Sequence, residues 1–401
     1  MSEPTSGSAS GFSRIRLGGD LKVTTDLTSV LLGALTLLLV GIGLIMVLSS
    51  SSITSYLAEQ GFFGGFWRQA GYAALGVPLM LIAAAMPIRF WKRYAWWFLG
   101  FGLILQTLVF IPGIGIDNFG NRNWIKLGPI TGQPSELLKL ALVVWIGAVL
   151  LAKERLLNQM KHELIPVILP GAILALGLVL LGKDLGTTMI MGVTVIGAMY
   201  FGGVRWRTLG VVVAAGGLLV LGSVITSENR LARIFATGAD YSGLDWQPLH
   251  GEWALAGGGL FGVGLGGSKA KWSWLPAADN DYIFAIIGEE LGLVGAMLVV
   301  LLFVTLAFLM MRAMAQARDR FGRAVIGGVM VWIIGQAFVN IGVVIRLFPV
   351  LGVPLPLISS GGTALIACLL AMGVVISISR DGAAYRAELR REGSGKPGGK
   401  S

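Results

Sequence analysis

Charged residues are scarce in this chain of 401 residues. Only 13% of the residues are Asp, Glu, Lys or Arg, whereas 55% are hydrophobic and the mean hydropathy is +0.78. One water-soluble core could not bury so much apolar surface. The composition therefore excludes an ordinary soluble domain and predicts a polytopic membrane protein.

Cysteine is almost absent as well. Cys368 is the only one, and it lies inside an apolar run, so no disulfide can form within the chain. The exterior loops must therefore be held by the helices or by a partner, and cysteine usage does not reveal the redox compartment.

Positive charge is in excess, since 31 Lys and Arg residues face 21 Asp and Glu. Such an excess can indicate nucleic-acid binding. Here, however, the basic residues fall in short clusters between apolar runs, which is the pattern of membrane topology. We expect no nucleic-acid partner.

Ten apolar runs are long enough to cross a bilayer core of about 30 Å as helices. The sequence thus predicts an all-α fold of ten transmembrane helices, with a large extracytoplasmic loop between the seventh and the eighth. The runs cover residues 29–48, 70–88, 95–111, 136–151, 164–181, 187–201, 209–225, 282–310, 324–345 and 360–378.

The basic residues also orient the chain. With the N-terminus inside, the inner segments hold 21 Lys and Arg and the outer segments hold nine. This bias predicts that both termini are cytoplasmic and that Asp281 lies outside. No cleavable signal is expected, because a polar leader of 28 residues precedes the first run.

Three parts follow from this division. Residues 1–28 and 381–401 are expected to be unstructured cytoplasmic tails, because neither has an apolar face that could offset its ordering entropy. The basic C-terminal tail could also rest on anionic lipid or dock a cytoplasmic protein. Residues 29–380 form the membrane domain, within which 227–281 is the large outer loop.

Asp281 ends this loop at the mouth of the eighth run. An ionisable group beside hydrocarbon is costly, which makes Asp281 the first candidate for chemistry. A helix N-cap is the structural alternative, and one residue could do both. Glu289 lies two turns deeper and either faces the same cavity or pairs across helices.

Several basic residues lie in the predicted outer segments, where Lys and Arg are less common than in the inner ones. Arg122, Lys126, Arg230 and Arg233 are either solvated loop charges or parts of an anion site. Lys139, one turn into the fourth run, either pairs with Glu136 on the same helix face or holds a phosphate in a polar cavity.

The glycine-rich stretch 257–267 invites comparison with a nucleotide-binding loop. No predicted strand or βαβ unit surrounds it, so we expect a close-packed turn instead. Pro354 and Pro356 break any helix before the tenth run. Ser359 and Ser360 follow, in a rigid loop or reentrant segment that could also line the substrate cavity.

Seven ordered motifs then permit a comparison with a known family. They are 123–128, Gln133-Pro134-Ser135-Glu136 with Lys139, Asp184-Leu185-Gly186-Thr187, 230–234, 257–266, 275–292 and 352–362. In these motifs, over about residues 29–380, the chain resembles the SEDS glycosyltransferases, the peptidoglycan polymerases typified by FtsW and RodA. Segments 340–342 and 352–362 look more like the division member, FtsW.

The resemblance implies polymerisation of lipid II at the outer membrane face during cell division, with release of undecaprenyl pyrophosphate. Asp281 matches the aspartate of the family's D-[FY]-I-F motif and would activate the acceptor 4-hydroxyl as a general base. The candidates for holding pyrophosphate are Arg122, Lys126, Lys139, Arg230 and Arg233. Lesser candidates are Glu136, Glu289, Gln247, Ser359 and Ser360.

The resemblance also implies a setting for the reaction. It suggests a divalent cation such as Mg²⁺ or Mn²⁺ and no organic cofactor. It implies partners in a class B penicillin-binding protein, other division proteins and membrane lipid, in the bacterial cytoplasmic membrane at the septum.

The chain departs from the family pattern at a few positions. Ala277 follows Leu275-Pro276 where an acid is usual, Asp279 stands where a histidine is common, and Lys183 precedes Asp184 in place of proline. None of these changes removes Asp281, so they affect which residues contact the phosphates more than which reaction is expected. An elongation polymerase of the RodA type, a lipid II flippase and a division scaffold without catalysis remain alternatives.

Overall fold

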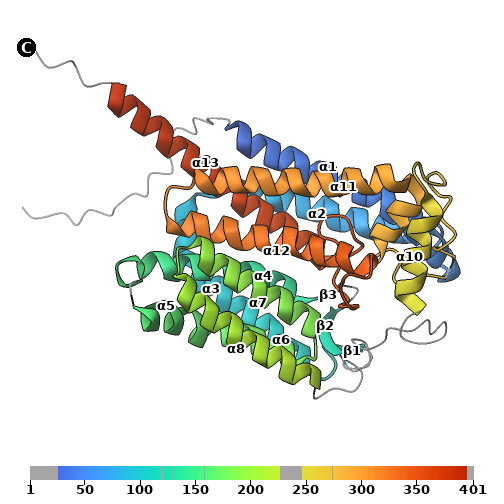
Figure 1. Ribbon diagram of the computed structural model, residues 1–401, viewed down its shortest axis with the longest axis horizontal. Helices are drawn as coiled ribbons and strands as arrows, with labels where there is room; N and C mark the ends of the chain where they lie inside the picture. Colours follow the sequence, from blue (N-terminus) through green and yellow to red (C-terminus); the bar gives the residue numbers. More distant parts are fainter. Residues whose placement is uncertain are drawn as a thin grey trace, which may run out of the picture.

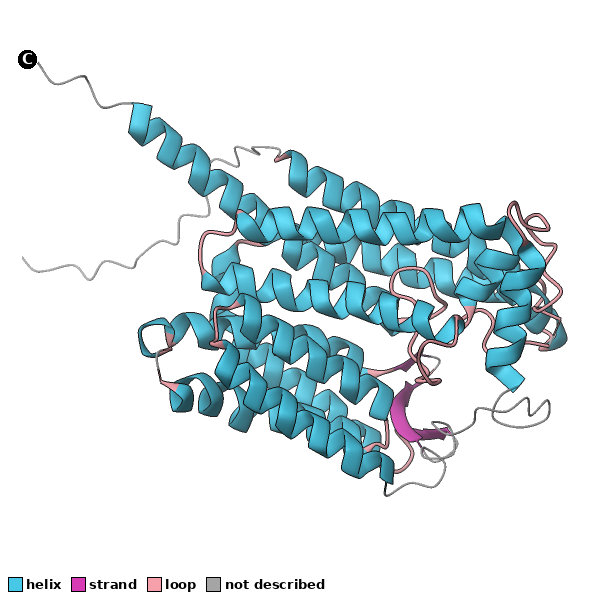
Figure 2. Ribbon diagram, viewed as in Figure 1, coloured by secondary structure: helices cyan, strands magenta, loops and turns pink. Residues whose placement is uncertain are grey.

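The computed structural model describes residues 26–118, 121–128, 130–157, 159–225, 246–272 and 274–394. Within these ranges the chain is a bundle of long helices, with a small sheet and several loops gathered at one end (Figures 1 and 2). The helices are α1 Leu27–Leu57, α2 Gly64–Ala85, α3 Ile88–Thr107, α4 Pro134–Ala152, α5 Met160–Val167, α6 Ile173–Leu181, α7 Leu185–Phe201, α8 Trp206–Ile225, α10 Trp246–Gly258, α11 Ile283–Ala315, α12 Arg320–Val344 and α13 Thr363–Ser394.

Helical structure covers most of each of the ten apolar runs, although the tenth begins with the non-helical residues 360–362. The fifth run is composite, because a π-helical segment, Ile168–Ala172, joins α5 to α6. Among the described residues, seven helical stretches are each long and apolar enough to cross a membrane. The segments Gly64–Ala85 and Ile88–Phe110 meet that test together and bend by 118° at their junction, and α7 is shorter.

The best buried of these helices form the centre of the bundle. They are α4, α12 and α13, whereas α8 packs at the edge and exposes most of its surface. Glycine permits close packing within this core: a Cβ atom on Gly373 of α13 would come 2.4 Å from the carbonyl oxygen of Met80 on α2. Small residues at such contacts let membrane helices approach closely.

The outer loop after the third run contains a sheet, which corrects the all-α prediction. Strands β1 Gly115–Asn118, β2 Asn121–Leu127 and β3 Ile130–Gly132 pair antiparallel in the order β1-β2-β3. The strands are too short for a clear alternating pattern, but their isoleucine, threonine and tryptophan residues favour extended backbone. Asn121, Asn123 and Trp124 of β2 line the same cavity as Asp281, so the sheet lies at the end of the bundle that carries this residue.

The C-terminal tail is also more ordered than predicted, because α13 continues to Ser394. Residues 381–394 are rich in alanine, arginine and glutamate, which favour helix. Arg386 donates to Gln316 Oε1 at 2.7 Å, and the Tyr385 ring lies 4.7 Å from the Arg318 guanidinium. These contacts hold the helix beyond the predicted membrane boundary. The predicted N-terminal tail, except for residues 26–28, lies outside the described residues.

The glycine-rich stretch forms the close-packed turn that the sequence predicts. Helix α11 is broken at Gly292, whose φ is +68°. The backbone of the turn fills this break, since Val263 N donates to Glu289 O at 3.0 Å, and Leu293 N donates to Gly259 O at 2.9 Å. The turn therefore completes hydrogen bonds that an unbroken helix would have made internally.

Gly262 is the tightest point of this turn, and its replacement tests the packing. Its φ is +78°, and an added Cβ would lie 2.1 Å from Glu290 O. Gly264 also has a positive φ, +91°, but has open space around it. We expect Gly264→Ala to cost about 1 kcal/mol of unfolding free energy through backbone strain, and Gly262→Ala about 3 kcal/mol through strain and overlap. Thermal unfolding in detergent would measure the difference, and equal losses would contradict the packing described.

Candidate functional site

Asp281 lines a cavity of about 360 Å³ at the sheet end of the bundle. Strand β2, the start of α4, the start of α10, the loop before α11 and the loop before α13 all contribute to its wall. The lining residues are Asn121, Asn123, Trp124, Gln133, Asp184, Gln247, Asn280, Asp281, Val350, Leu351, Gly352, Pro354, Gly361 and Ala364.

The backbone around Asp281 is held firmly, whereas one of its side-chain oxygens is buried without a partner among the described residues. Asn340 Nδ2 on α12 donates to the carbonyl oxygen of Asp281 at 2.7 Å and to that of Val353 at 2.8 Å. The N-cap of α11 is Tyr282, and no side-chain cap forms. Asp281 Oδ1 has no hydrogen-bond partner among the described residues. The structure therefore does not show the N-cap role for the Asp281 side chain.

The surroundings of Asp281 make its carboxyl group a much stronger base than an ordinary aspartate. Burial is the main cause, and the negative charges of Asp279 and Asp184 add to it, so that the pKa of Asp281 rises from 3.8 to about 7. The residue nonetheless keeps an intermediate exposure because it faces the cavity. A base with a pKa near neutral pH can accept a proton and release it again at physiological pH.

Asp184 is a second carboxylate in the cavity that the sequence did not single out as a site residue. It caps α7, because its Oδ1 accepts from Thr187 N at 2.9 Å, and its Oδ2 accepts from Gln133 Nε2 at 3.1 Å. The sequence signal that could have identified Asp184 as a site residue is its place in an Asp-Leu-Gly-Thr motif at the start of a helix. Only the fold shows that this helix start meets Asp281.

Two asparagines add unpaired oxygens to the same lining. The Oδ1 atoms of Asn123 and Asn280 have no hydrogen-bond partner within the described part of the chain. Asn123 is buried and belongs to β2, while Asn280 directly precedes Asp281. Two carboxylates and two amide groups therefore make the wall rich in hydrogen-bond acceptors.

The predicted outer cations that the structure describes on β2 do not line this cavity. Arg122 and Lys126 are exposed on β2, and Arg122 Nε lies 3.3 Å from Asp117 Oδ2. Arg230 and Arg233 fall in 226–245, outside the described residues. Among the described residues, no lysine or arginine lines the cavity wall.

Lys139 is enclosed in the bundle core, in the arrangement that the pairing hypothesis predicted. Its Nζ lies 2.9 Å from Glu136 Oε2, donates to Gln336 Oε1 at 3.0 Å and sits 4.7 Å from the ring centre of Trp332. Only 1% of Lys139 is exposed, so the structure does not present its ammonium to the cavity. Gln336 Nε2 in turn donates to Pro354 O at 2.8 Å, which links the buried pair to the cavity wall.

The lesser candidates divide into one cavity residue and several loop anchors. Gln247 lines the cavity and donates to Pro276 O at 2.9 Å. Ser359 Oγ donates to Asn280 O at 2.6 Å, and Ser360 N donates to Asp279 O at 2.9 Å. The two serines thus join the loop before α13 to the loop before α11.

Glu289 does not reach the Asp281 cavity as the sequence suggested it could. Its carboxylate accepts from Lys269 N at 2.9 Å, from Ala270 N at 3.3 Å and from the hydroxyl of Ser268. These bonds face the outer loop, on another side of α11. Its partners are loop groups, so among the described residues Glu289 neither lines the cavity nor pairs with a charge across helices.

The buried pair can be tested by removing its members separately and together. Lys139→Met leaves Glu136 as a buried carboxylate without its cation, and we expect a loss of about 3–5 kcal/mol in unfolding free energy. The double variant Glu136→Gln with Lys139→Met removes both charges and should recover most of that loss. Thermal or denaturant unfolding measures both, and a double variant no more stable than Lys139→Met would contradict the pairing.

Comparisons with known proteins show which family the chain resembles over most of its length. The model of the FtsW, RodA and SpoVE family, described as "Cell cycle protein", matches residues 29–383. A probable peptidoglycan glycosyltransferase FtsW of Mycobacterium tuberculosis is 37% identical over 351 residues, which cover 86% of this chain and 67% of that protein. Stage V sporulation protein E of Bacillus subtilis is 35% identical over 368 residues, covering 89% of this chain and 99% of that protein.

Two solved structures share the fold. A chain from the structure described as "Structural coordination of polymerization and crosslinking by a peptidoglycan synthase complex" matches with a TM-score of 0.71 at 24% identity, covering 90% of this chain and 99% of that one. The rod shape determining protein RodA of Thermus thermophilus matches with a TM-score of 0.64 at 25% identity, covering 90% of this chain and 98% of that one.

Proposed function

The chain belongs to the FtsW, RodA and SpoVE family of cell cycle proteins, and we propose that it is a peptidoglycan glycosyltransferase that polymerises lipid II during cell division. Relatives named FtsW and stage V sporulation protein E, at 35–37% identity over most of the chain, support this assignment. The observation that carries the mechanism is the Asp281 carboxylate, which lines the cavity and whose buried Oδ1 has no hydrogen-bond partner among the described residues.

The proposed topology has ten membrane spans with both termini in the cytoplasm. Seven stretches meet the length and composition test singly. The 118° bend between α2 and α3 supports counting them as two spans, and the 17 residues of α7 gain length from flanking residues. The excess of Lys and Arg on the opposite side supports an extracytoplasmic Asp281 cavity.

In the proposed reaction Asp281 acts as general base. As the 4-hydroxyl oxygen of the acceptor sugar attacks C1 of the donor sugar, an oxygen of Asp281 takes the hydroxyl proton. The new glycosidic bond forms while the bond from C1 to the diphosphate oxygen breaks, and the diphosphate leaves with the electron pair. Asn340, which holds the backbone of Asp281, serves to position the base.

The leaving diphosphate needs positive charge that the described cavity wall does not supply. Mg²⁺ commonly uses one or two carboxylates together with substrate phosphates. Among the described residues there is no group of three or more His, Cys, Asp or Glu placed for a metal. Asp184, Asn123 and Asn280 line the cavity with carboxylate and amide oxygens, the ligand types that suit Mg²⁺ or Mn²⁺, and they leave Asp281 to act as the base.

When bound, such a cation would neutralise charge on the diphosphate. Arg230 and Arg233 are the other proposed sources of positive charge near the cavity. Arg122 and Lys126, exposed on β2, are proposed to attract the second anionic substrate at longer range. Lys139 is proposed to act indirectly, through Gln336 and Pro354.

The partner in this proposal is a class B penicillin-binding protein, with other division proteins and membrane lipid around it, in the cytoplasmic membrane at the septum. The likeness of fold to a chain of a peptidoglycan synthase complex supports the partner. The RodA-like fold keeps an elongation role as the second candidate. The names of the relatives in sequence favour division.

Asp281→Asn tests the base directly. With its transpeptidase partner, the wild-type chain should convert labelled lipid II into polymer that lysozyme digests. The variant should lose about 10²- to 10⁴-fold in rate, because an amide cannot accept the proton. Asp279→Asn, two residues away, is the matched control and should keep most of the activity.

The rival functions give other outcomes in the same assay. A flippase without polymerase activity would form no polymer in the wild type, and Asp281→Asn would still transport lipid II across vesicles. A scaffold would support division in cells that carry Asp281→Asn. Either result would overturn the proposed chemistry.

The pH dependence of the rate follows from the raised pKa of Asp281. The base is active when ionised, so kcat/KM should rise roughly tenfold per pH unit below about pH 7 and level off above it. Asp279→Asn removes a negative charge that raises the pKa, so its midpoint should move to lower pH. Initial rates from pH 5 to 9 would show both effects, and a flat profile would contradict Asp281 as base.

A further inference from the structure

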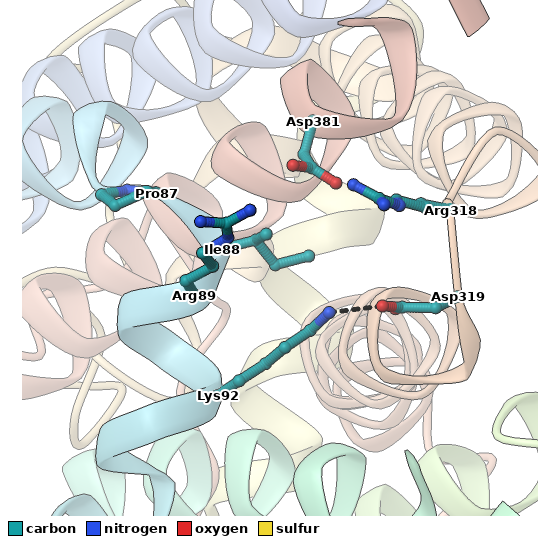
Figure 3. A pocket seen from close by; sticks show the side chains of 7 residues that line it. All are labelled: Pro87, Ile88, Arg89, Lys92, Arg318, Asp319 and Asp381. Atoms are coloured by element: carbon teal, nitrogen blue, oxygen red, sulfur yellow. Dashed lines mark hydrogen bonds and ion pairs between the residues drawn. The ribbon is translucent and has the colours of Figure 1, made fainter. Parts of the chain in front are cut away.

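A second cavity, of about 470 Å³, lies among the start of α3, the turn from α11 to α12 and the part of α13 around Asp381 (Figure 3). It has no residue in common with the Asp281 cavity. Its lining residues are Pro87, Ile88, Arg89, Lys92, Arg318, Asp319 and Asp381. Three of these are cations and two are acids, which leaves one net positive charge.

Both acids already face cations. Lys92 forms an ion pair with Asp319, and Asp319 also accepts from Gly322 N at 3.0 Å as the cap of α12. Figure 3 shows the Arg318 guanidinium directed toward the Asp381 carboxylate. Lys92 is therefore ion-paired within the protein, and the Arg318 guanidinium contacts the Tyr385 ring besides facing Asp381.

Arg89 makes no direct contact of this kind, although its charge also acts on Asp381 at longer range. Its side chain is exposed, and within the described residues it has no hydrogen-bond or ion-pair partner. It extends from the first turn of α3 at the cavity wall (Figure 3). An arginine in this state can form charge-assisted hydrogen bonds to an anionic oxygen without breaking existing contacts.

The start of α3 adds a second attraction for an anion at the same place. This helix is 20 residues long, and its N-cap, Pro87, makes no side-chain capping bond. The first backbone N–H groups and the positive end of the helix dipole therefore meet the cavity, since Pro87 and Ile88 both line it.

The surroundings indicate an anion that belongs to a lipid. Leu81 and Ile82 near the end of α2 are 59% and 53% exposed, and Trp96 and Trp97 of α3 are 58% and 75% exposed. Exposed aliphatic side chains followed by tryptophan are typical of the boundary between acyl chains and headgroups. In the proposed topology this end of the bundle is cytoplasmic.

We propose that this cavity binds the phosphate of an anionic phospholipid of the inner leaflet, such as phosphatidylglycerol, through Arg89 and the N-terminus of α3. Basic pockets between transmembrane helices on the cytoplasmic side are a known setting for such headgroups. The lipid joins α3, the turn from α11 to α12, and α13 at a point where the ion pair of Lys92 and Asp319 is partly exposed to solvent. The proposal rests on the proposed topology and is independent of glycosyl transfer.

The test measures lipid-dependent thermal unfolding of the full chain in a neutral detergent at 0.15 M salt. Phosphatidylglycerol, phosphatidylethanolamine and phosphatidylcholine are titrated separately, and apparent dissociation constants follow from the shift in Tm. Phosphatidylglycerol should bind most tightly, because it alone carries a net negative charge to match the cavity.

Two arginine variants on the same helix separate the site from general attraction. Arg89→Gln should weaken the binding of phosphatidylglycerol about tenfold, the effect of losing one charge-assisted contact. Arg93→Gln is the control, since Arg93 is exposed at the same end of α3 but does not line the cavity. It should bind phosphatidylglycerol as the wild type does.

Several outcomes would overturn the proposal. They are equal binding of the three lipids, equal losses in Arg89→Gln and Arg93→Gln, and stabilisation by inorganic phosphate or glycerol phosphate as strong as that by the lipid. Because the readout is thermal unfolding, a failure here would leave the polymerase assay and its interpretation unaffected. An inactive chain that still binds phosphatidylglycerol through Arg89 would count only against the proposed function.

Discussion

The main constraint on this structure is that the Asp281 carboxylate is held out of bulk water at the edge of a hydrophobic bundle, which costs free energy. That cost raises the pKa of Asp281 to about 7, and it is sustained only because the surrounding backbone is fixed. Asn340 ties the start of α11 to the loop at Val353, and Ser359 ties that loop to Asn280. Buried polar side chains therefore serve the site by fixing loops rather than by touching a substrate.

The buried charges of α4 belong to the same arrangement. Glu136 and Lys139 neutralise one another inside the core, and Gln336 carries the connection from Lys139 to Pro354. Charged residues in a membrane bundle are costly unless each has a partner. Their presence next to the cavity wall is explained by the need to hold Pro354, which has no N–H of its own, in an irregular segment.

The sequence predicted those elements that have a local signal in the chain. It did not predict the features that depend on contacts between distant residues. Apolar length located all ten helical runs, and the glycine spacing predicted the tight turn. The sequence did not predict the strands around Asn123, because they are short. It did not predict the extension of α13 beyond residue 380, because the contacts that stabilise it, such as Arg386 with Gln316, join residues distant in sequence. The sequence could not predict that Asp184 and Asp281 line the same cavity, because 96 residues lie between them in the chain.

The break at Gly292 has a mechanical consequence. The nine residues from Ile283 to Leu291 are bonded to the glycine turn rather than forming one straight rod with the rest of α11. This helical segment begins two residues after Asp281, and the turn bonded to its far end carries Phe261, which is 81% exposed. The backbone bonds of the turn thus connect an exposed aromatic side chain at the surface with the segment that follows the carboxylate.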